Sequence, residues 1–388
     1  MKIVHASLNL VRLPLVHSFE TSSHRKTHLD HILVELVDEQ GNSGWGEIAS
    51  PSDPYYAADT VDTSWLIATR YLLPAVVGAE LEAPDRMPGL VAKVRGHRFA
   101  VAGLDAAGWA LWATRHAIPL ASALGGTRRS VTAGVSLGIE PTVDELLAQV
   151  QRQVDAGYGR IKLKIAPGWD HEPVRAVRAT FPGVRVQVDA NGAYRDESAH
   201  LAALRRLDDA GLLMIEQPFP PRDLLASADL QARLTTPICL DESIETVEDL
   251  RTADALGAGR ILNVKVSRMG GLSAAVRAHD TARELGWPAW CGGMHEFGVG
   301  RAANVALSSL PGFTLPSDVS ASEKYYARDV TEPITADHGV VEVSTRPGLG
   351  VAVDAEFLAG HRLRSFALGD GPEPVSASPL LHRQGDPR

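Results

Sequence analysis

Residues 160–166 read RIKLKIA, and four later runs share their character. These runs are VRVQVDAN at 184–191, LLMIEQP at 212–218, PICLDES at 237–243 and RILNVKV at 260–266. Each run is short, rich in branched apolar residues and interrupted near its end by a charged residue. Amphipathic segments with helical spacing separate the runs, as in TVDELLAQVQRQVDAG. Short apolar runs that alternate with helices are typical of parallel strands buried on both faces.

Three further runs extend this pattern on both sides: VTAGVSLGI at 131–139, PAWCGGM at 288–294 and FTLPSDV at 313–319. Eight strand-like runs separated by helical segments favour a closed barrel over an open sheet. We therefore predict an α/β fold with a TIM-like (β/α)7β barrel. An open doubly wound sheet is the alternative architecture.

The sequence on either side of the barrel region has a different pattern. Near the start, residues 3–13 alternate like a strand, a turn at 38–42 joins two further strands, and apolar spacing becomes helical over 61–115. The end of the chain, 371–388, is rich in Pro, Gly and Ser and is expected to be a surface tail. The predicted divisions are 1–125 for an α+β part, 126–319 for the barrel and 320–388 for a C-terminal stretch that includes this tail.

The composition excludes several classes of protein. Of 388 residues, 45% are hydrophobic and 22% charged, which excludes a disordered or fibrous chain. The net charge of −9 argues against a nucleic-acid-binding surface, which needs clustered Lys and Arg. No apolar run approaches the about 18 residues of a membrane span, and the first residues alternate without the apolar core of a signal peptide. The two cysteines, Cys239 and Cys291, cannot form a disulfide framework, so a reducing, cytoplasmic location is expected.

Charged residues occupy the C-terminal ends of five successive runs: Lys164, Asp189, Glu216, Asp241 and Lys265. Neighbouring members are 24–27 residues apart, which is the length of one strand–helix unit. The three carboxylates are therefore expected on adjacent strands, with a lysine on each flanking strand. Barrel active sites are built at this end of the strands. Isolated ion pairs are the alternative, but they would not place every charge at the same end.

This set of charges predicts a kind of chemistry. Three converging carboxylates repel one another unless a cation lies between them. Oxygen ligands favour a hard ion such as Mg²⁺, with positions left for substrate oxygens. Two ammonium groups on opposite sides of that ion could exchange a proton with a carbon atom between them.

The segments KLK, QVDAN, IEQP, CLDES and NVKVSRMGG together resemble the enolase superfamily in its muconate-lactonising subgroup. Longer stretches are most similar to the o-succinylbenzoate synthase / N-acylamino acid racemase family: IKLKIAPGWDHEPVRAVR, TPICLDESI, CGGM, GRAANVALSSLPGFTLPSDVSAS, GHR at 96–98 and VTEPI at 330–334. The resemblance covers nearly the whole chain. It implies that the N-terminal part and the C-terminal stretch form an α+β capping domain over the barrel mouth, with a lid loop near 17–28.

Position by position, the resemblance implies Mg²⁺ ligands at Asp189, Glu216 and Asp241, with Mn²⁺ as an alternative ion. Lys164 and Lys265 would be the acid–base pair. Substrate-binding or supporting roles are expected for the residues around them: Lys162, Asn191, Glu242, Arg268, Ser136, Met294, His295, Phe297 and Glu20.

The implied activity is removal of the α-proton of a carboxylate substrate through an enediolate, stabilised by the metal ion and Lys162. It would serve o-succinylbenzoate synthesis, N-acylamino acid racemisation or both. The alternatives are another enzyme of the subgroup, such as a muconate cycloisomerase or a dipeptide epimerase, and a non-catalytic scaffold. The expected partner is a small carboxylate molecule. Neither nucleic acid nor a membrane is expected, and the chain is expected to form homo-oligomers.

Two segments depart from the pattern of the family. After the seventh strand the chain reads GGMHEFG, with His295 and Phe297 where relatives more often have a small aliphatic and a small polar residue. The lid carries Glu20 where relatives often have Arg. Because this negative charge would repel a distal carboxylate, we expect N-succinyl substrates to be poorer here than in close relatives, and neutral or apolar N-acyl substrates to do comparatively better, unless Arg25 or Lys26 offsets it.

Overall fold

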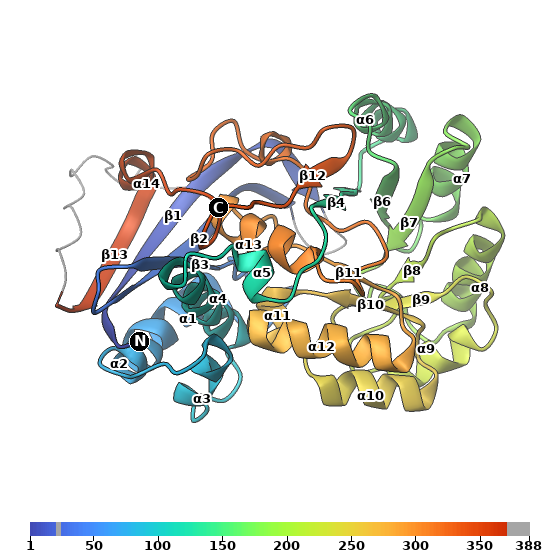
Figure 1. The fold of residues 1–388 in the computed structure, drawn as a ribbon. Coiled ribbons are helices and arrows are strands. Elements are labelled where there is room, and N and C mark those ends of the chain that lie inside the picture. Colours follow the sequence, from blue (N-terminus) through green and yellow to red (C-terminus); the bar gives the residue numbers. More distant parts are fainter. Residues whose placement is uncertain (21–24, 371–388) are drawn as a thin grey trace, which may run out of the picture.

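The computed structural model describes residues 1–20 and 25–370 (Figure 1). An antiparallel sheet with its helices lies at one end, and a curled parallel sheet surrounded by helices lies at the other. The predicted α/β fold with a TIM-like barrel and an α+β part is confirmed. The antiparallel sheet has the order β13-β1-β2-β3, with bounds Ile3–Glu20 (β1), Arg25–Asp38 (β2), Ser43–Ile48 (β3) and Arg362–Gly369 (β13).

The turn between β2 and β3 is the one that the sequence predicts at 38–42. The carboxylate of Asp38 accepts hydrogen bonds from the backbone N–H groups of Gln40 and Asn42, both at 2.9 Å. Gly41 adopts a left-handed φ of 82°, which costs glycine little. This turn fixes the register in which β3 pairs with β2.

The helix α4 (Arg98–Arg115) packs across this sheet and is mostly buried. The neighbouring helices are Val61–Ile67 (α1), Ala68–Leu72 (η1), Leu73–Val76 (α2), Pro84–Arg86 (η2), Met87–Leu90 (α3) and Leu120–Ala123 (α5). Gly46 in β3 allows the strand and α4 to approach closely, because a Cβ atom at this position would lie 2.0 Å from the carbonyl oxygen of Gly103. We call the antiparallel sheet with α1–α4, and the segments that join them, the cap.

The barrel sheet is parallel, with strand order β11-β10-β9-β8-β7-β6-β5. Its strands are Val135–Leu137 (β5), Arg160–Lys164 (β6), Arg185–Asp189 (β7), Ile215–Glu216 (β8), Ile238–Leu240 (β9), Ile261–Val264 (β10) and Ala289–Cys291 (β11). Figure 1 shows helices around its outside, and the helices of this region are Val143–Asp155 (α6), His171–Thr180 (α7), Ser198–Leu207 (α8), Asp208–Ala210 (η3), Leu224–Gln231 (α9), Val247–Leu256 (α10), Val266–Met269 (α11), Leu272–Leu285 (α12) and Gly298–Ser308 (α13). Successive apolar runs of the sequence therefore form neighbouring strands.

The eighth run, FTLPSDV, differs from the prediction because it is not a regular strand. It makes single parallel bridges, from Phe313 to Ala289 of β11 and from Ser317 to Ala133 just before β5. Pro316 lies between these bridges and has no N–H to donate, which interrupts a regular ladder. The run still connects the two outer strands of the sheet and closes the ring.

The expected lid is mostly strand in the described residues. The ladder between β1 and β2 continues to the pair Glu20 and Arg25, so 17–20 and 25–28 are extended, and residues 21–24 lie outside the described residues. The expected surface tail at 371–388 also lies outside them.

The C-terminal stretch contributes to the cap, because β13 pairs with β1. The other elements of this stretch are Ser322–Lys324 (η4), Val340–Glu342 (β12), which pairs with Ser130–Thr132 (β4), and Ala355–His361 (α14). Domain boundaries at 125 and 319 remain a proposal.

A buried carboxylate of the cap attaches it to the barrel at α13. Glu47 of β3 accepts hydrogen bonds from the backbone N–H groups of Phe297 (2.8 Å) and Gly300 (2.7 Å). These groups lie at a helix N-terminus, where N–H groups lack partners within the helix. His31 of β2 also contacts the carboxylate, with Nδ1 2.6 Å from Oε1. The start of α13 is thereby held against the cap.

A second carboxylate, Asp105 of α4, caps α12. It is fully buried and accepts hydrogen bonds from the backbone N–H of Ser273 (2.9 Å) and from the Ser273 hydroxyl (2.7 Å). Burial raises the pKa of Asp105 to about 7, although the two hydrogen bonds oppose the rise. Gly271 is required here, because its φ is 123° and a Cβ atom would lie 2.4 Å from the carboxylate.

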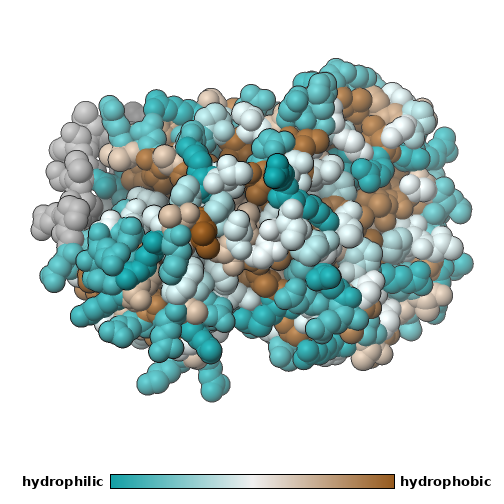
Figure 2. All heavy atoms as spheres, in the orientation of Figure 1, coloured by the Kyte–Doolittle hydropathy of each residue, from teal (hydrophilic) through white to brown (hydrophobic). Residues whose placement is uncertain are grey.

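The surface shows no single dominant apolar area on the face in Figure 2, where hydrophobic residues lie among hydrophilic and intermediate ones. Exposed large apolar side chains are spread over the molecule: Val16, Tyr55, Leu66, Tyr71, Leu225, Leu256, Val340 and Leu363. Within the described ranges, no helix is long and apolar enough to cross a bilayer.

The Asp105→Asn variant is expected to change how stability depends on pH. A carboxyl group with a pKa of about 7 in the folded protein, against 3.8 when free, favours folding in its protonated form. The stabilisation by the protonated carboxyl of Asp105 is therefore fully present below pH 3.8, and it is lost as the pH rises from 3.8 toward about 7. Asn cannot ionise, so the free energy of unfolding of the wild type should fall relative to that of the variant over this interval. Urea denaturation across the interval measures the difference, with the exposed Glu82→Gln as the control. Parallel curves for wild type and Asp105→Asn would contradict this role of Asp105.

Candidate active site

Five strands of the barrel bring the predicted charges to one edge of the sheet. Lys164 ends β6, Asp189 ends β7 and Glu216 ends β8. The ladders pair Lys164 with Asp189, and Asp189 with Glu216. Asp241 directly follows β9, and Lys265 directly follows β10. All five residues are buried, and the carboxylates lie on adjacent strands with one lysine on each side.

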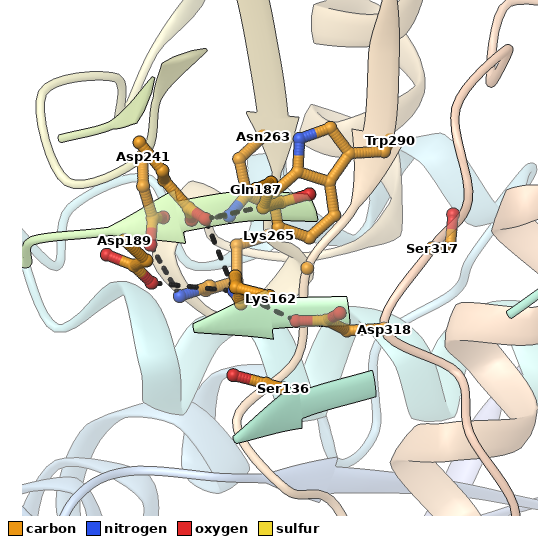
Figure 3. Close-up of polar contacts among 12 residues, drawn as sticks. Ser136, Lys162, Gln187, Asp189, Asp241, Asn263, Lys265, Trp290, Ser317 and Asp318 are labelled. Carbon is orange, nitrogen blue, oxygen red and sulfur yellow. Dashed lines mark hydrogen bonds and ion pairs between the residues drawn. The ribbon is translucent and has the colours of Figure 1, made fainter. Parts of the chain in front are cut away.

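Each outer carboxylate forms an ion pair with the lysine beside it. Lys164 Nζ lies 2.6 Å from Asp189 Oδ2, and Lys265 Nζ lies 2.8 Å from Asp241 Oδ2. Figure 3 shows Asp189, Asp241 and Lys265 close together. Arg268 contacts the other oxygen of Asp241 through Nη1. Burial alone would raise the pKa of Asp241, but Lys265 and Arg268 outweigh it and lower the pKa to about 2.

Glu216, the middle carboxylate, is held mainly by neutral donors. Asn263 Nδ2 donates to one oxygen at 2.8 Å and Gln187 Nε2 to the other at 3.0 Å, while Lys162 Nζ lies 3.3 Å away. Burial raises the pKa of Glu216 to about 8, and the charge of Asp189 adds to the rise. A further cation beside Glu216 would oppose this rise, because it would favour the charged form.

The chemistry of the three carboxylates fits a hard divalent cation, which prefers charged oxygen ligands. As the side chains stand, no group of three or more His, Cys, Asp or Glu side chains in the described part of the chain has the arrangement to hold a metal ion. Lysine and arginine side chains contact the outer carboxylates instead. A metal ion at this place would have to displace some of these ion pairs.

Lys164 is held by barrel residues that the sequence singled out. Besides its ion pair, its Nζ donates to Asn191 Oδ1 at 2.6 Å. Asn191 Nδ2 donates in turn to Glu242 Oε1 at 2.8 Å. Burial raises the pKa of Glu242 to about 7, and the charge of Asp241 adds to the rise. Asn191 and Glu242 are thus linked to Lys164 in one hydrogen-bonded chain.

Lys265 has a partner that sequence reasoning missed. Its Nζ donates to the hydroxyl of Tyr56 at 2.7 Å, and Tyr56 lies in the cap segment between β3 and α1. The Tyr56 hydroxyl is also 3.5 Å from both oxygens of Asp241. Burial raises the pKa of the Tyr56 phenol, so the phenol keeps its proton. Tyr56 lies outside the strand–helix repeat of the barrel, so the regular spacing that predicts the barrel residues does not predict it.

Lys162 lies among carboxylates within the barrel (Figure 3). Its Nζ is 3.0 Å from Asp318 Oδ2, 3.3 Å from Glu216 and 3.5 Å from Asp189, and it lies over the ring of Trp290, 4.8 Å from its centroid. Burial opposes the charge, but the carboxylates, Asp318 foremost, raise the pKa of Lys162. Lys162 is therefore positively charged at neutral pH. Asp318 was not among the predicted site residues.

These groups line a cavity of about 180 Å³ between the cap and the barrel. The predicted site residues that line it are Ser136, Lys162, Lys164, Asn191, Glu242, Lys265, Met294 and His295. The cap contributes lining residues that were not predicted as site residues: Phe19, Lys26, Tyr55 and Tyr56. Pockets for drug-sized ligands are about 300–1,000 Å³, so this cavity suits a smaller molecule. A larger cleft of about 640 Å³ beside α5 and α13 contains none of these residues.

Three of the predicted supporting residues lie away from the cavity wall. Phe297 is fully buried in a core with its ring against His31. Arg268 is buried beside Asp241, and its Nη2 donates to the carbonyl of Asn263 at 2.7 Å. Glu20 is exposed at the end of β1.

His295 stands in the cavity wall between two aromatic rings. Its ring centroid is 4.3 Å from that of Phe19 and 4.8 Å from that of Tyr325. Burial lowers the pKa of His295, and the nearby charge of Lys26 adds to the effect, so the imidazole is neutral. Burial also lowers the pKa of Lys26 to about 8. The lid strands therefore present a positive charge to the cavity, whereas the negative charge of Glu20 lies at the surface.

Polar groups near the end of β5 complete this side of the cavity. Ser136 Oγ is buried and makes no hydrogen bond to any of the described residues (Figure 3). The Ser136 carbonyl accepts a hydrogen bond from Lys324 Nζ at 2.6 Å. Burial lowers the pKa of Lys324 to about 7. An unpaired hydroxyl on a cavity wall is available to a polar atom of a substrate.

Comparison with known proteins shows relatives along nearly the whole chain. Residues 145–357 match the family described as enolase C-terminal domain-like. The o-succinylbenzoate synthase of Geobacillus kaustophilus is 45% identical over 355 residues, which cover 91% of this chain and 94% of that protein. The N-succinylamino acid racemase of an Amycolatopsis species is 46% identical over 359 residues, which cover 92% of this chain and 97% of that protein.

The architecture agrees with these matches. The crystal structure of an enolase-superfamily member from Listeria innocua has a TM-score of 0.91 and 36% sequence identity to this chain, with 95% of this chain and 99% of the other covered. The relatives named above are enzymes with small-molecule substrates. Sequence motifs, fold and relatives thus lead to one conclusion: the chain is an enzyme and belongs to the enolase superfamily.

Proposed function

We propose that the enzyme removes the α-proton of a carboxylate substrate, in o-succinylbenzoate synthesis, N-acylamino acid racemisation or both. The observation that carries the proposal is the placement of Lys164 and Lys265 on the two sides of a row of carboxylates, with both lysines lining one small cavity. The relatives that bear the names of a synthase and a racemase support it.

We also propose that Asp189, Glu216 and Asp241 hold Mg²⁺, with Mn²⁺ as an alternative. When bound, the ion supplies positive charge that stabilises negative charge on the substrate carboxylate. Two observations support the assignment. The donors are carboxylates, which Mg²⁺ prefers, and the raised pKa of Glu216 reflects burial and mutual repulsion that a cation would relieve.

Lys162 would stabilise the same negative charge from the protein side. Its neighbouring carboxylates keep it protonated, and it lines the cavity. Removal of the α-proton converts the substrate into an enediolate, which is too unstable in water to form quickly. Fixed positive groups in a site that excludes water lower the energy of such a species without having to reorganise.

The two lysines would move the protons. The lysine that acts as base must be neutral when it accepts the α-proton. In racemisation, the opposite lysine gives its own proton to the other face of the same carbon. In the synthase reaction, Lys164 takes the α-proton and returns it to the leaving β-hydroxyl group as the C–O bond breaks, which releases water. Lys265 would then remain protonated beside the enediolate.

The first test of this function is proton exchange. In D₂O with Mg²⁺, the wild type should exchange the α-proton of both enantiomers of an N-succinylamino acid, which NMR detects as loss of the α-proton signal. Lys164→Ala and Lys265→Ala should each stop interconversion, and each should still exchange the enantiomer whose α-proton faces the remaining lysine. Equal loss for both enantiomers in both variants would rule out two separate bases. A wild type that exchanges neither enantiomer would contradict the proposed function itself.

The second test concerns the metal ion. EDTA should abolish exchange, and added Mg²⁺ should restore it. Asp241→Asn should weaken Mg²⁺ binding by about tenfold or more, because a neutral amide is a poorer ligand than a carboxylate. Calorimetric titration of Mg²⁺ measures the affinity without substrate. The exposed Asp209→Asn is the control and should bind Mg²⁺ like the wild type.

The third test concerns the acyl group: because Lys26 lines the cavity and Glu20 is exposed at the surface, we propose that Lys26 outweighs Glu20 and favours N-succinyl substrates. A positive charge on the cavity wall stabilises a substrate with two carboxylates more than a substrate with one. Lys26→Met should therefore lower kcat/KM for N-succinyl relative to N-acetyl forms of one amino acid, by about tenfold. Glu20→Arg should leave this ratio unchanged. A change caused by Glu20→Arg but not by Lys26→Met would show that charge outside the cavity sets the selectivity.

A further inference from the structure

The two lysines of the site are held by different parts of the molecule. The hydrogen bonds of Lys164 go to a carboxylate and an amide at the end of β7 in the barrel. Those of Lys265 go to Asp241 of the barrel and to Tyr56 of the cap. Within the described residues, Lys265 therefore takes a hydrogen-bond partner from the cap, whereas Lys164 is hydrogen-bonded by the barrel alone.

Tyr56 lies in a segment of the cap that hydrogen bonds fasten near its two ends. The hydroxyl groups of Ser50 and Ser64 lie 2.6 Å apart. The backbone N–H of Val61 donates to the carbonyl of Pro51 at 3.0 Å, which closes the segment on itself. Tyr56 is therefore presented to the cavity by the framework of the cap.

The geometry of Tyr56 is that of an acceptor for the lysine. Its hydroxyl is 2.7 Å from Lys265 Nζ, while the two oxygens of Asp241 are farther away at 3.5 Å. A neutral phenol can accept one N–H of an amine or ammonium group through its oxygen. The contact can therefore persist whether Lys265 carries a charge or not.

This contact bears on how Lys265 would transfer a proton. An amine that takes a proton from carbon must point its lone pair at that carbon. The flexible four-carbon stem of a lysine leaves this direction to the partners of the nitrogen. A neutral amine that donates one N–H to Tyr56 has its rotation restricted, and the lone pair then has a defined direction.

We propose that Tyr56 is a positioning residue for Lys265 and not for Lys164, so that the cap governs proton transfer on one face of the substrate only. This inference rests on the proposed function, since it requires both lysines to transfer α-protons. It predicts an asymmetry between enantiomers when the Tyr56 hydroxyl is removed. Loss of a residue that only stabilised the fold would slow α-proton exchange of both enantiomers alike.

The experiment is α-proton exchange in D₂O with Mg²⁺, followed by NMR for each enantiomer of an N-succinylamino acid. Lys164→Ala and Lys265→Ala first establish which enantiomer each lysine serves. Tyr56→Phe keeps the ring and removes only the hydroxyl. It should lower kcat for the enantiomer whose α-proton Lys265 removes by about tenfold, the scale of one hydrogen bond, with little change in KM. Exchange of the other enantiomer should be unchanged.

Matched variants separate positioning from general effects. Tyr71→Phe removes a hydroxyl from an exposed tyrosine of the cap and should leave both enantiomers unchanged. Asn191→Leu removes the amide partner of Lys164 and should slow the enantiomer that Tyr56→Phe leaves unchanged. The thermal unfolding midpoint of Tyr56→Phe should lie within a few degrees of that of the wild type, because one hydrogen bond is lost, and a general loss of stability would slow exchange of both enantiomers alike.

The outcomes distinguish this inference from the function on which it rests. Equal slowing of both enantiomers by Tyr56→Phe, no slowing, or slowing only of the enantiomer served by Lys164 would overturn the inference and leave the proposed function intact. A wild type that exchanges neither enantiomer would overturn the proposed function, and the inference would fall with it.

Discussion

The carboxylate of Glu47 makes the contact on which the geometry of the cavity depends. It is buried in β3 of the cap and contacts His31. It also accepts hydrogen bonds from the backbone N–H groups at the start of α13. Replacing such a buried carboxylate would leave its hydrogen-bond donors buried without an acceptor, which lowers the stability of the folded protein. The turn just before α13 carries Met294 and His295 to the cavity wall. The cap therefore fixes the position of one wall of the site as well as covering it.

The row of charges at the barrel edge has a cost in stability. Lys164, Asp189, Glu216, Asp241 and Lys265 are all buried, and desolvation opposes the charge of each carboxylate of the row. Buried ion pairs often add little to stability, because desolvation offsets much of their attraction. An apolar core in the same place would be a simpler way to stabilise a barrel. The arrangement is better explained as a site kept for chemistry at some expense of stability.

Residues of the barrel could be predicted from sequence because each follows its strand at a regular interval, and parallel strands align their ends. Asp189 and Glu216 thus occupy paired positions, as the interval between them indicates. Lys26 was expected only as a lid residue that could offset Glu20, and Tyr56 was not predicted, since both reach the cavity from cap segments that have no periodic relation to the barrel. The ring closure was predicted as a regular eighth strand, but Pro316 interrupts its hydrogen bonds. Periodicity therefore reveals what a repeat positions, and it does not reveal contacts between unlike parts of the chain.

The pairing of β13 with β1 has a consequence for biosynthesis. Partners such as His5 and Gly369 are separated by almost the entire chain, and contacts of such separation form slowly. Until β13 emerges from the ribosome, the edge of β1 presents unpaired N–H and C=O groups that can pair with another chain. The barrel strands precede β13 in the chain, so during synthesis they are available for pairing before the cap sheet can gain its β13 strand. That stage is where protection by a chaperone would matter most for this protein.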